Sequence, residues 1–198
     1  MSENIHPIFN NMLDRTAKES LLQQRAVVIW MTGLSGSGKS TLAKGLESKL
    51  YNEGILTKLL DGDNLRTGLN KNLSFSEEDR QENIRRVAET AKLFLENGIV
   101  TICSFVSPTK DIRNMAANII GKADFLELYI AASFDACAQR DVKGLYKKAL
   151  NGEIKDFTGL DAPFDAPEDP FLLVDTEKLN IDESIDLLYT ELIKKIKQ

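Results

Sequence analysis

Eight consecutive residues, Gly33 to Ser40, constrain the fold of this chain more than any other stretch. They read Gly-Leu-Ser-Gly-Ser-Gly-Lys-Ser, which is a glycine, four free positions and then Gly-Lys-Ser. In a loop of this pattern the glycines let several backbone N–H groups converge on one anion. The lysine reaches the β- and γ-phosphates of a nucleotide, and the serine hydroxyl binds Mg²⁺. The pattern therefore predicts a site for a nucleoside triphosphate, here ATP, and Mg²⁺ at Lys39 and Ser40.

The flanks of this phosphate loop fit the prediction. Residues 26–31 form a short apolar run that suits a buried strand, and Leu42, Leu46 and Leu50 recur at helical spacing after the loop. Strand, loop and helix in this order are what the motif requires. The helix that begins at the loop adds the positive end of its dipole to the anion site.

The rest of the chain predicts an α/β fold, namely the P-loop NTPase three-layer α/β/α sandwich with a mostly parallel sheet. From Ala26 onward, apolar runs of strand length alternate with segments of helical period. We expect strands at residues 26–32, 55–60, 99–104, 125–131 and 172–175. We expect helices at about 14–24, 40–52, 77–97, 110–120, 134–141 and 182–196. Ser76 and Asp79 resemble a capping box at the third of these, and Gly98 suits a left-handed cap after it.

The length of 198 residues favours one sizeable domain. We assign residues 1–25, which are polar and mixed, to an N-terminal extension and residues 26–198 to the phosphate-loop domain. Between about 141 and 170 the alternating pattern fails, and lysines mix with glycines and prolines. We interpret this stretch as a mobile lid, because phosphoryl transfer requires that water be excluded. A solvated surface connection is the alternative.

Composition excludes several classes of protein. The net charge of -5 argues against a nucleic-acid partner, whose phosphates require a basic surface. Cys103 and Cys137 lie far apart in the sequence, and His6 is the single histidine that could join them in a metal site. We therefore expect neither a disulfide nor a zinc site, and we interpret both cysteines as reduced thiols that pack in the core. We find neither a signal peptide nor an uncharged apolar run approaching twenty residues, so we expect a cytoplasmic protein with no membrane partner.

Two carboxylates follow the second expected strand, in the sequence Asp61-Gly62-Asp63. Ligands of open α/β sheets bind at the carboxyl ends of the strands, so this loop is expected to face the nucleotide. Asp63 can accept the proton of an attacking hydroxyl, and Asp61 can hold Mg²⁺ through water. The alternative is a turn whose carboxylates bond to their own backbone.

Further candidates follow along the chain. Arg80 and Asn83 are neighbours on one helix face, and arginine forks such as those of Arg66 and Arg80 match the oxygens of phosphate and sulfate. A solvated helix face is the alternative for this pair. Phe75 and Phe157 lie in polar surroundings, where each is either a plate for a purine or a stray core contact.

Taken together, these motifs resemble the adenylylsulfate kinase family over residues 26–196. The stretches that carry the resemblance are residues 33–40, 60–66, 68–70, 75–80, 82–86, 107–108, 143–149 and 157–159. The resemblance implies that ATP phosphorylates the 3′-hydroxyl of adenosine 5′-phosphosulfate (APS), which gives 3′-phosphoadenosine 5′-phosphosulfate (PAPS) and ADP in sulfate assimilation. It also implies a homodimer, and it leaves a separate sulfurylase partner open.

The resemblance also implies roles for individual residues. Phe75 and Phe157 would sandwich the adenine of the substrate, Asp63 would face its 3′-hydroxyl, and Lys143 would close over the nucleotides. The phosphosulfate would be held by Arg66, Arg80 and Asn83. The ATP-binding residues would be Gly33, Leu34, Ser35, Gly36, Ser37, Gly38, Lys39, Ser40 and Thr41. The remaining substrate contacts would be Phe105, Val106, Ser107, Leu145 and Thr158.

Ser107 matches a serine that this family is often described as phosphorylating transiently. In-line transfer between two bound nucleotides needs no phosphoenzyme, so we expect Ser107 to border the substrate without an obligatory phosphoserine.

Two other functions compete with this one. One is a P-loop kinase for a nucleoside or a sugar, which would not need the two phenylalanines. The other is a nucleotide-dependent switch of the GTPase kind, which needs Asn-Lys-x-Asp to read guanine. Residues 70–73 read Asn-Lys-Asn-Leu and lack that aspartate.

Overall fold

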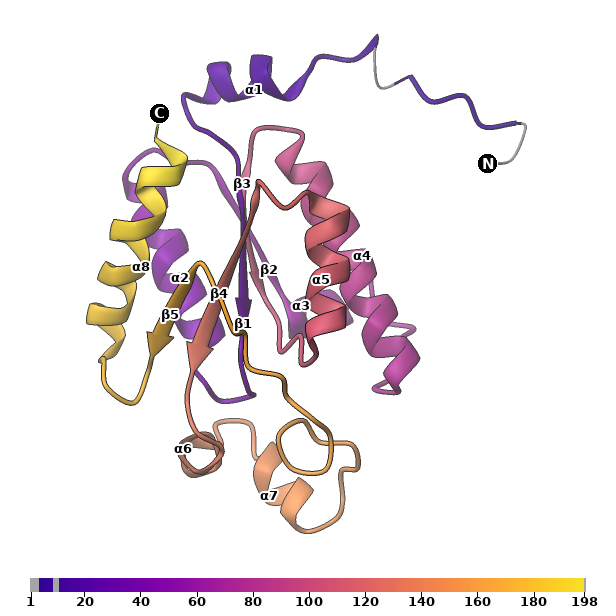
Figure 1. Ribbon diagram of the computed structural model, residues 1–198, viewed down its shortest axis with the longest axis vertical. Coiled ribbons are helices and arrows are strands. Elements are labelled where there is room, and N and C mark those ends of the chain that lie inside the picture. Colours follow the sequence, from indigo (N-terminus) through magenta and orange to yellow (C-terminus); the bar gives the residue numbers. More distant parts are fainter. Residues whose placement is uncertain (1–3, 9–10, 198) are drawn as a thin grey trace.

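A single five-stranded sheet organises the computed structural model, which describes residues 4–8 and 11–197 (Figure 1). The strands are β1 (Val28–Thr32), β2 (Thr57–Asp61), β3 (Val100–Ser104), β4 (Phe125–Ala131) and β5 (Leu172–Asp175). They lie in the order β2-β3-β1-β4-β5, and every neighbouring pair is parallel. The predicted α/β fold with its parallel sheet is confirmed.

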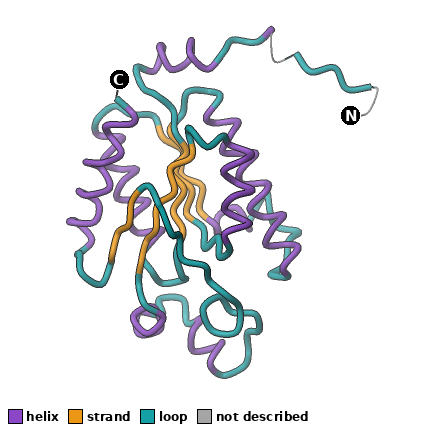
Figure 2. The backbone as a smooth tube through the Cα atoms, in the orientation of Figure 1, coloured by secondary structure: helices purple, strands orange, loops and turns teal. Residues whose placement is uncertain are grey.

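Helices precede, connect and follow the strands (Figure 2). They are α1 (Arg15–Leu22), α2 (Lys39–Asn52), α3 (Gly62–Arg66), α4 (Glu77–Leu95), α5 (Lys110–Ile120), α6 (Phe134–Arg140), α7 (Leu145–Leu150) and α8 (Ile181–Ile196). Six of them were predicted from the sequence, with ends that differ from the expected ones by at most two residues. The sequence did not predict α3 and α7, because five or six residues are too few to show a helical period.

Helices cover both faces of the sheet (Figure 1), and an apolar cluster lies between the sheet and the helices on each face. Successive side chains of a strand point to opposite faces. Ile29 and Met31 of β1 therefore pack with α2 and α8 on one face. Trp30 packs with α4 and α5 on the other face. Because β1 is buried on both sides, its sequence is a continuous apolar run rather than an alternating one.

The predicted capping box at α4 is wrong in its second half. Ser76 does cap the helix, since its hydroxyl accepts from the Asp79 N–H at 3.2 Å. The Asp79 carboxylate, however, accepts from the backbone N–H of Ser74 at 2.7 Å rather than from Ser76. Gly98 has a φ of 77°, as predicted for a left-handed position.

Helix α1 lies across the end of the sheet at which the strands begin. Arg15 donates to the Asp124 carboxylate at 2.6 and 3.0 Å and to the Ala26 carbonyl at 2.6 Å. Gln24 bridges the backbones of Leu56 and Gly98. Residues 15–24 are thus fastened to the sheet, although the sequence indicated no role for them.

Both cysteines are buried free thiols, as predicted, and burial raises the pKa of each. Within residues 4–8 and 11–197, no helix combines the length and the apolar character that spanning a bilayer requires. In the same described part of the chain, no three His, Cys, Asp or Glu side chains gather as a metal site.

Candidate active site

The phosphate loop joins β1 to α2 at the carboxyl ends of the strands. Gly33 has a φ of 151°, and a Cβ atom there would lie 2.4 Å from the Ile130 carbonyl oxygen. Gly38 has a φ of 103° and is the N-cap of α2. Neither position accepts a side chain without strain. The helix consequently starts at Lys39, with the free N–H groups of its first turn next to the loop.

Lys39 is buried within this loop. Its Nζ donates to the carbonyl oxygens of Gly33 at 2.8 Å and Leu34 at 2.7 Å. Burial disfavours the charged ammonium and lowers the pKa of Lys39 to about 8. A negative phosphate beside the ammonium would favour the charged form and raise this pKa again.

We expect ATP binding to take up protons above pH 8 because of Lys39. Free protein then holds this lysine partly neutral, whereas a bound triphosphate restores its charge, so ATP affinity falls as pH rises through about 8. Titration calorimetry at about pH 8.5, in two buffers of different ionisation enthalpy, measures the uptake. Lys39→Arg should abolish it, because arginine stays charged at this pH. Equal proton uptake by both proteins would contradict the assignment.

Ser40 and Asp61, the two residues predicted for a magnesium site, are in contact. The Ser40 hydroxyl donates to the Asp61 carboxylate at 2.7 Å. Asp61 ends β2 and also accepts from the Asp63 N–H at 3.1 Å, which starts α3. A hydroxyl and a carboxylate are the hard oxygen donors that Mg²⁺ takes from proteins, with water and phosphate completing the coordination. The residues present therefore fit this ion.

Asp63, the predicted base, forms an ion pair with Lys143 of the lid segment. Both side chains are more than half exposed, so the pair adds little to stability. The ion pair instead holds the lid segment next to the loop that follows β2. The structure thus places two predicted site residues, 80 positions apart, in direct contact.

The lid segment packs on the phosphate loop through aromatic side chains. Tyr146 of α7 is 2% exposed, and its hydroxyl donates to the Ser35 carbonyl at 2.7 Å. The ring of Phe157 meets that of Tyr146 edge-on, with 4.9 Å between centroids. Leu34 belongs to the same apolar cluster, and Leu145 packs against it. The lid thus has a small core of its own, and its mobility stays a prediction.

Arg80 joins the two loops that carry the predicted stacking residues. Its Nε donates to the Phe75 carbonyl at 2.8 Å, and one terminal nitrogen donates to the Asp156 carbonyl at 2.6 Å. The other terminal nitrogen reaches the Thr158 hydroxyl at 3.2 Å. The Phe75 ring is 66% exposed, whereas Phe157 is buried in the lid cluster. Of the two predicted stacking residues, Phe75 is therefore the exposed one.

Arg66 and Asn83 flank this region. The Arg66 guanidinium lies 4.2 Å from the centre of the Phe75 ring and also donates to the Leu73 carbonyl at 3.1 Å. Asn83 is buried on α4, where its side-chain oxygen accepts from Asn70 at 2.9 Å. Asn70 is a contact that sequence reasoning missed.

The loop after β3 places its larger side chains in the core. Phe105 stacks on Trp30 with 5.8 Å between ring centroids. Ser107 is 2% exposed, and its hydroxyl accepts from the Trp30 indole N–H at 3.1 Å. The Val106 carbonyl accepts from the Thr32 hydroxyl at 2.6 Å. Phe105, Val106 and Ser107 were all predicted as substrate contacts. The side chains of Phe105 and Ser107 are instead buried beneath the surface of the site.

A cavity of about 590 Å³ beside the phosphate loop contains residues that the sequence did not reveal. Arg140 and Thr176 line it together with Thr41. Arg140 donates to the Thr176 hydroxyl at 2.9 Å, which in turn donates to the Ser37 carbonyl at 3.0 Å. Thr176 directly follows β5, so the rule that ligands bind at the carboxyl ends of strands could have found it. No pattern marked Arg140.

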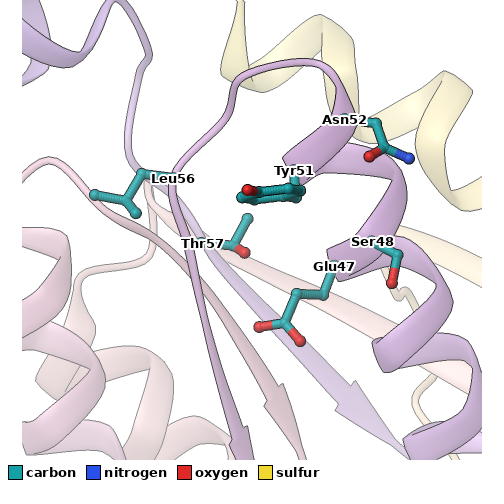
Figure 3. A pocket seen from close by; sticks show the side chains of 6 residues that line it. All are labelled: Glu47, Ser48, Tyr51, Asn52, Leu56 and Thr57. Atoms are coloured by element: carbon teal, nitrogen blue, oxygen red, sulfur yellow. The ribbon is translucent and has the colours of Figure 1, made fainter.

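A second hollow, of about 420 Å³, lies between the end of α2 and the start of β2 (Figure 3). Its lining residues are Glu47, Ser48, Tyr51, Asn52, Leu56 and Thr57. None of them was a predicted site residue. Lys39 starts α2 and Tyr51 lies near its end, so this hollow is far from the phosphate loop.

A phosphate loop, an adjacent carboxylate pair and a lid that contacts both define a small-molecule kinase of the P-loop class. The sequence model of the family described as adenylylsulphate kinase matches residues 25–175. The chain belongs to this family.

Individual relatives agree with this assignment. The adenylyl-sulfate kinase of Bacteroides thetaiotaomicron is 56% identical over 195 residues, which are 98% of this chain and 97% of that protein. The Phocaeicola vulgatus adenylyl-sulfate kinase is 59% identical over 94% of this chain and 91% of its own. The Mycobacterium tuberculosis APS kinase CysC, solved in complex with AMPPNP and APS, superimposes with a TM-score of 0.82. It is 42% identical, over 85% of this chain and 98% of that one.

Proposed function

We propose that this kinase transfers the γ-phosphate of ATP to the 3′-hydroxyl of APS, with PAPS and ADP as products. One observation carries the mechanism: the hydrogen bond between Ser40 and Asp61 holds the loop with Asp63 against the phosphate loop. The proposed base, Asp63, and the loop that binds the phosphates of ATP are thereby held together. The relatives' names and the APS bound to the M. tuberculosis enzyme support APS as the acceptor.

Each group has a defined part in the transfer. Lys39 and the first turn of α2 hold the β- and γ-phosphates and stabilise the charge on the oxygens of the moving phosphoryl group. Asp63 accepts the proton as the 3′-hydroxyl oxygen attacks in line. A magnesium ion held by Ser40 and Asp61 would supply further charge neutralisation. Lys143 pairs with Asp63, so its ammonium lies beside the proposed base and would neutralise phosphate charge there.

The acceptor nucleotide is proposed to lie between the lid and α4. The exposed face of Phe75 stacks on the adenine, and Phe157 closes the opposite side once the lid adjusts. Arg66, Arg80 and Asn83 supply donors for the phosphosulfate oxygens. The cavity lined by Arg140 and Thr176 is the proposed place for the base of ATP, because it adjoins Gly36 and Gly38.

An acceptor panel tests the proposal. The full chain is incubated with Mg·ATP and APS while ADP is followed, and nucleosides, gluconate and shikimate serve as control acceptors. We expect strong acceleration of ADP release by APS alone. Acceleration by a nucleoside or a sugar acid would favour a kinase of another specificity. ADP release that no acceptor stimulates would favour a nucleotide switch. Membership of the family argues against both.

For Ser107 we expect a structural effect rather than a catalytic one. Ser107→Ala removes the acceptor of the buried Trp30 N–H, which costs about 1–3 kcal/mol of stability when such a group is left unpaired. The melting temperature should fall while kcat stays within about tenfold of the unaltered protein. Turnover is measured with APS, and radiolabelled γ-phosphate is sought on the protein. Loss of turnover together with label on the unaltered protein would establish a phosphoenzyme.

The proposal extends to the setting of the enzyme. A homodimer follows from the resemblance to the family, as does a place in cytoplasmic sulfate assimilation. APS is an adenylated sulfate, so an enzyme of the sulfurylase class must supply it, and that enzyme is the proposed partner. Light scattering of the full chain should give twice the monomer mass of 22.1 kDa. A mass of one chain at assay concentration would contradict the dimer.

A further inference from the structure

Asn70 is a fully buried side chain between α3 and α4 that the mechanism has not used. Its exposed fraction is 0%, and its backbone is bonded on both sides. The Asn70 N–H donates to the Leu65 carbonyl at 2.9 Å, and its own carbonyl accepts from Leu73 at 3.1 Å. The side chain makes one hydrogen bond, in which Nδ2 donates to Oδ1 of Asn83 at 2.9 Å.

This contact fixes the polarity of the Asn83 amide. Since Oδ1 of Asn83 faces Asn70, its NH₂ group points the other way. Within the described residues this NH₂ group has no protein acceptor, and it is not among the enclosed unpaired atoms. Oxygens of sulfate and ionised phosphate only accept hydrogen bonds, so an amide can bind them only through its NH₂ group. The orientation in which Asn83 accepts from Asn70 is the one that an anionic ligand needs.

The arrangement has a cost at Asn70 itself. Its Oδ1 is enclosed and has no hydrogen-bond partner. An unpaired buried acceptor is unfavourable, and most buried polar atoms in folded proteins are paired. A leucine, which has the same branched shape and no polar side-chain atom, would avoid this cost. Asn70 leaves its own oxygen unpaired while it donates to Asn83. A role in ligand binding explains this arrangement better than a contribution to stability does.

The turn that carries Asn70 is held firmly. Arg86 of α4 donates to the Leu69 carbonyl at 3.2 Å and to the Asn72 side chain at 2.8 Å. Arg66 donates to the Leu73 carbonyl at 3.1 Å from the other side. Asn70 therefore has little freedom to follow Asn83 if the amide of Asn83 turns over.

We propose that Asn70 is a positioning residue for APS. It turns the Asn83 amide so that the NH₂ group donates to the anionic phosphosulfate, and it makes no contact with the substrate itself. This inference rests on the proposed function, since APS is taken as the ligand that Asn83 meets.

Asn70→Asp tests the polarity. An ionised carboxylate only accepts, so it would draw the NH₂ group of Asn83 toward residue 70 and turn the amide oxygen toward the anion. We expect the KM for APS to rise about tenfold or more, as for loss of a hydrogen bond to a charged group, with the KM for ATP unchanged. Asn70→Leu, which directs Asn83 neither way, should give a smaller rise. Asn72→Asp, the same change on the exposed side of this turn, should leave both KM values unchanged.

A pH series separates positioning from damage to the fold. Burial raises the pKa of a carboxyl group, and its protonated form can donate to Oδ1 of Asn83 as asparagine does. In Asn70→Asp the KM for APS should therefore fall toward the original value between about pH 8 and pH 6. The unaltered protein should not show this recovery. Absence of recovery, or equal rises of both KM values, would overturn the inference. Failure of the unaltered protein to use APS would instead overturn the proposed function.

Discussion

Replacing Lys39 with alanine should lower kcat/KM for APS phosphorylation by at least ~100-fold, because it removes a buried positive charge from the phosphoryl group in transfer. The ammonium donates to the carbonyl oxygens of Gly33 and Leu34 inside the loop. A lysine on the surface could not reach this position and could not replace it. Burial also strengthens its effect on the phosphate, since little water screens the charge. The rate is measured from ADP release with APS and Mg·ATP.

Lys44→Ala is the matched control for this experiment. Lys44 belongs to the same helix but is exposed to solvent. We expect its kcat/KM to stay near that of the unaltered protein. Lys39→Ala should remain folded, because removal of a buried ammonium relieves its desolvation. Folded Lys39→Ala with most of its activity would remove this residue from the mechanism.

Asp63→Asn should lower kcat by at least ~100-fold with a smaller change in the KM for ATP, because the amide cannot accept the proton of the acceptor hydroxyl. The substitution conserves volume and leaves the backbone N–H of residue 63 free to bond with Asp61. It also weakens the ion pair with Lys143, which is exposed and adds little to stability. Stopped-flow measurement of the first turnover reports the chemical step directly.

Asp111→Asn provides the comparison for Asp63. Asp111 is an exposed carboxylate in the first turn of α5, and its loss should leave kcat unchanged. If Asp63→Asn keeps most of its single-turnover rate, the proton must go to another acceptor, and the assignment of the base is wrong.

The sequence predicted the sheet and its long helices because the strands are short apolar runs and the helices repeat their apolar residues at helical spacing. Residues 28–31 of β1 are all apolar because α2 and α8 bury one face of the strand and α4 and α5 bury the other. α3 and α7 carry no such signal. α3 is only five residues long and is started by the Asp61 side chain, and α7 lies among the glycines and lysines of the lid.

The candidate site was predictable where short motifs directly follow predicted strands. Lys39, Ser40 and Asp61 come together because a loop and a neighbouring strand end meet at one edge of a parallel sheet. The burial of Ser107 against Trp30 could not be predicted, since these residues are 77 positions apart. The link from Arg80 to the lid near Thr158 depends in the same way on tertiary packing.

The identity of the product tests the central claim most directly. Phosphorus NMR of the full chain with Mg·ATP and APS should show ADP and one new phosphate monoester, coupled to the proton on the ribose 3′-carbon, while the phosphosulfate signal is retained. This result requires that ATP in the phosphate loop face the ribose of APS. Release of inorganic phosphate without a new monoester, or a monoester at another position, would contradict the account.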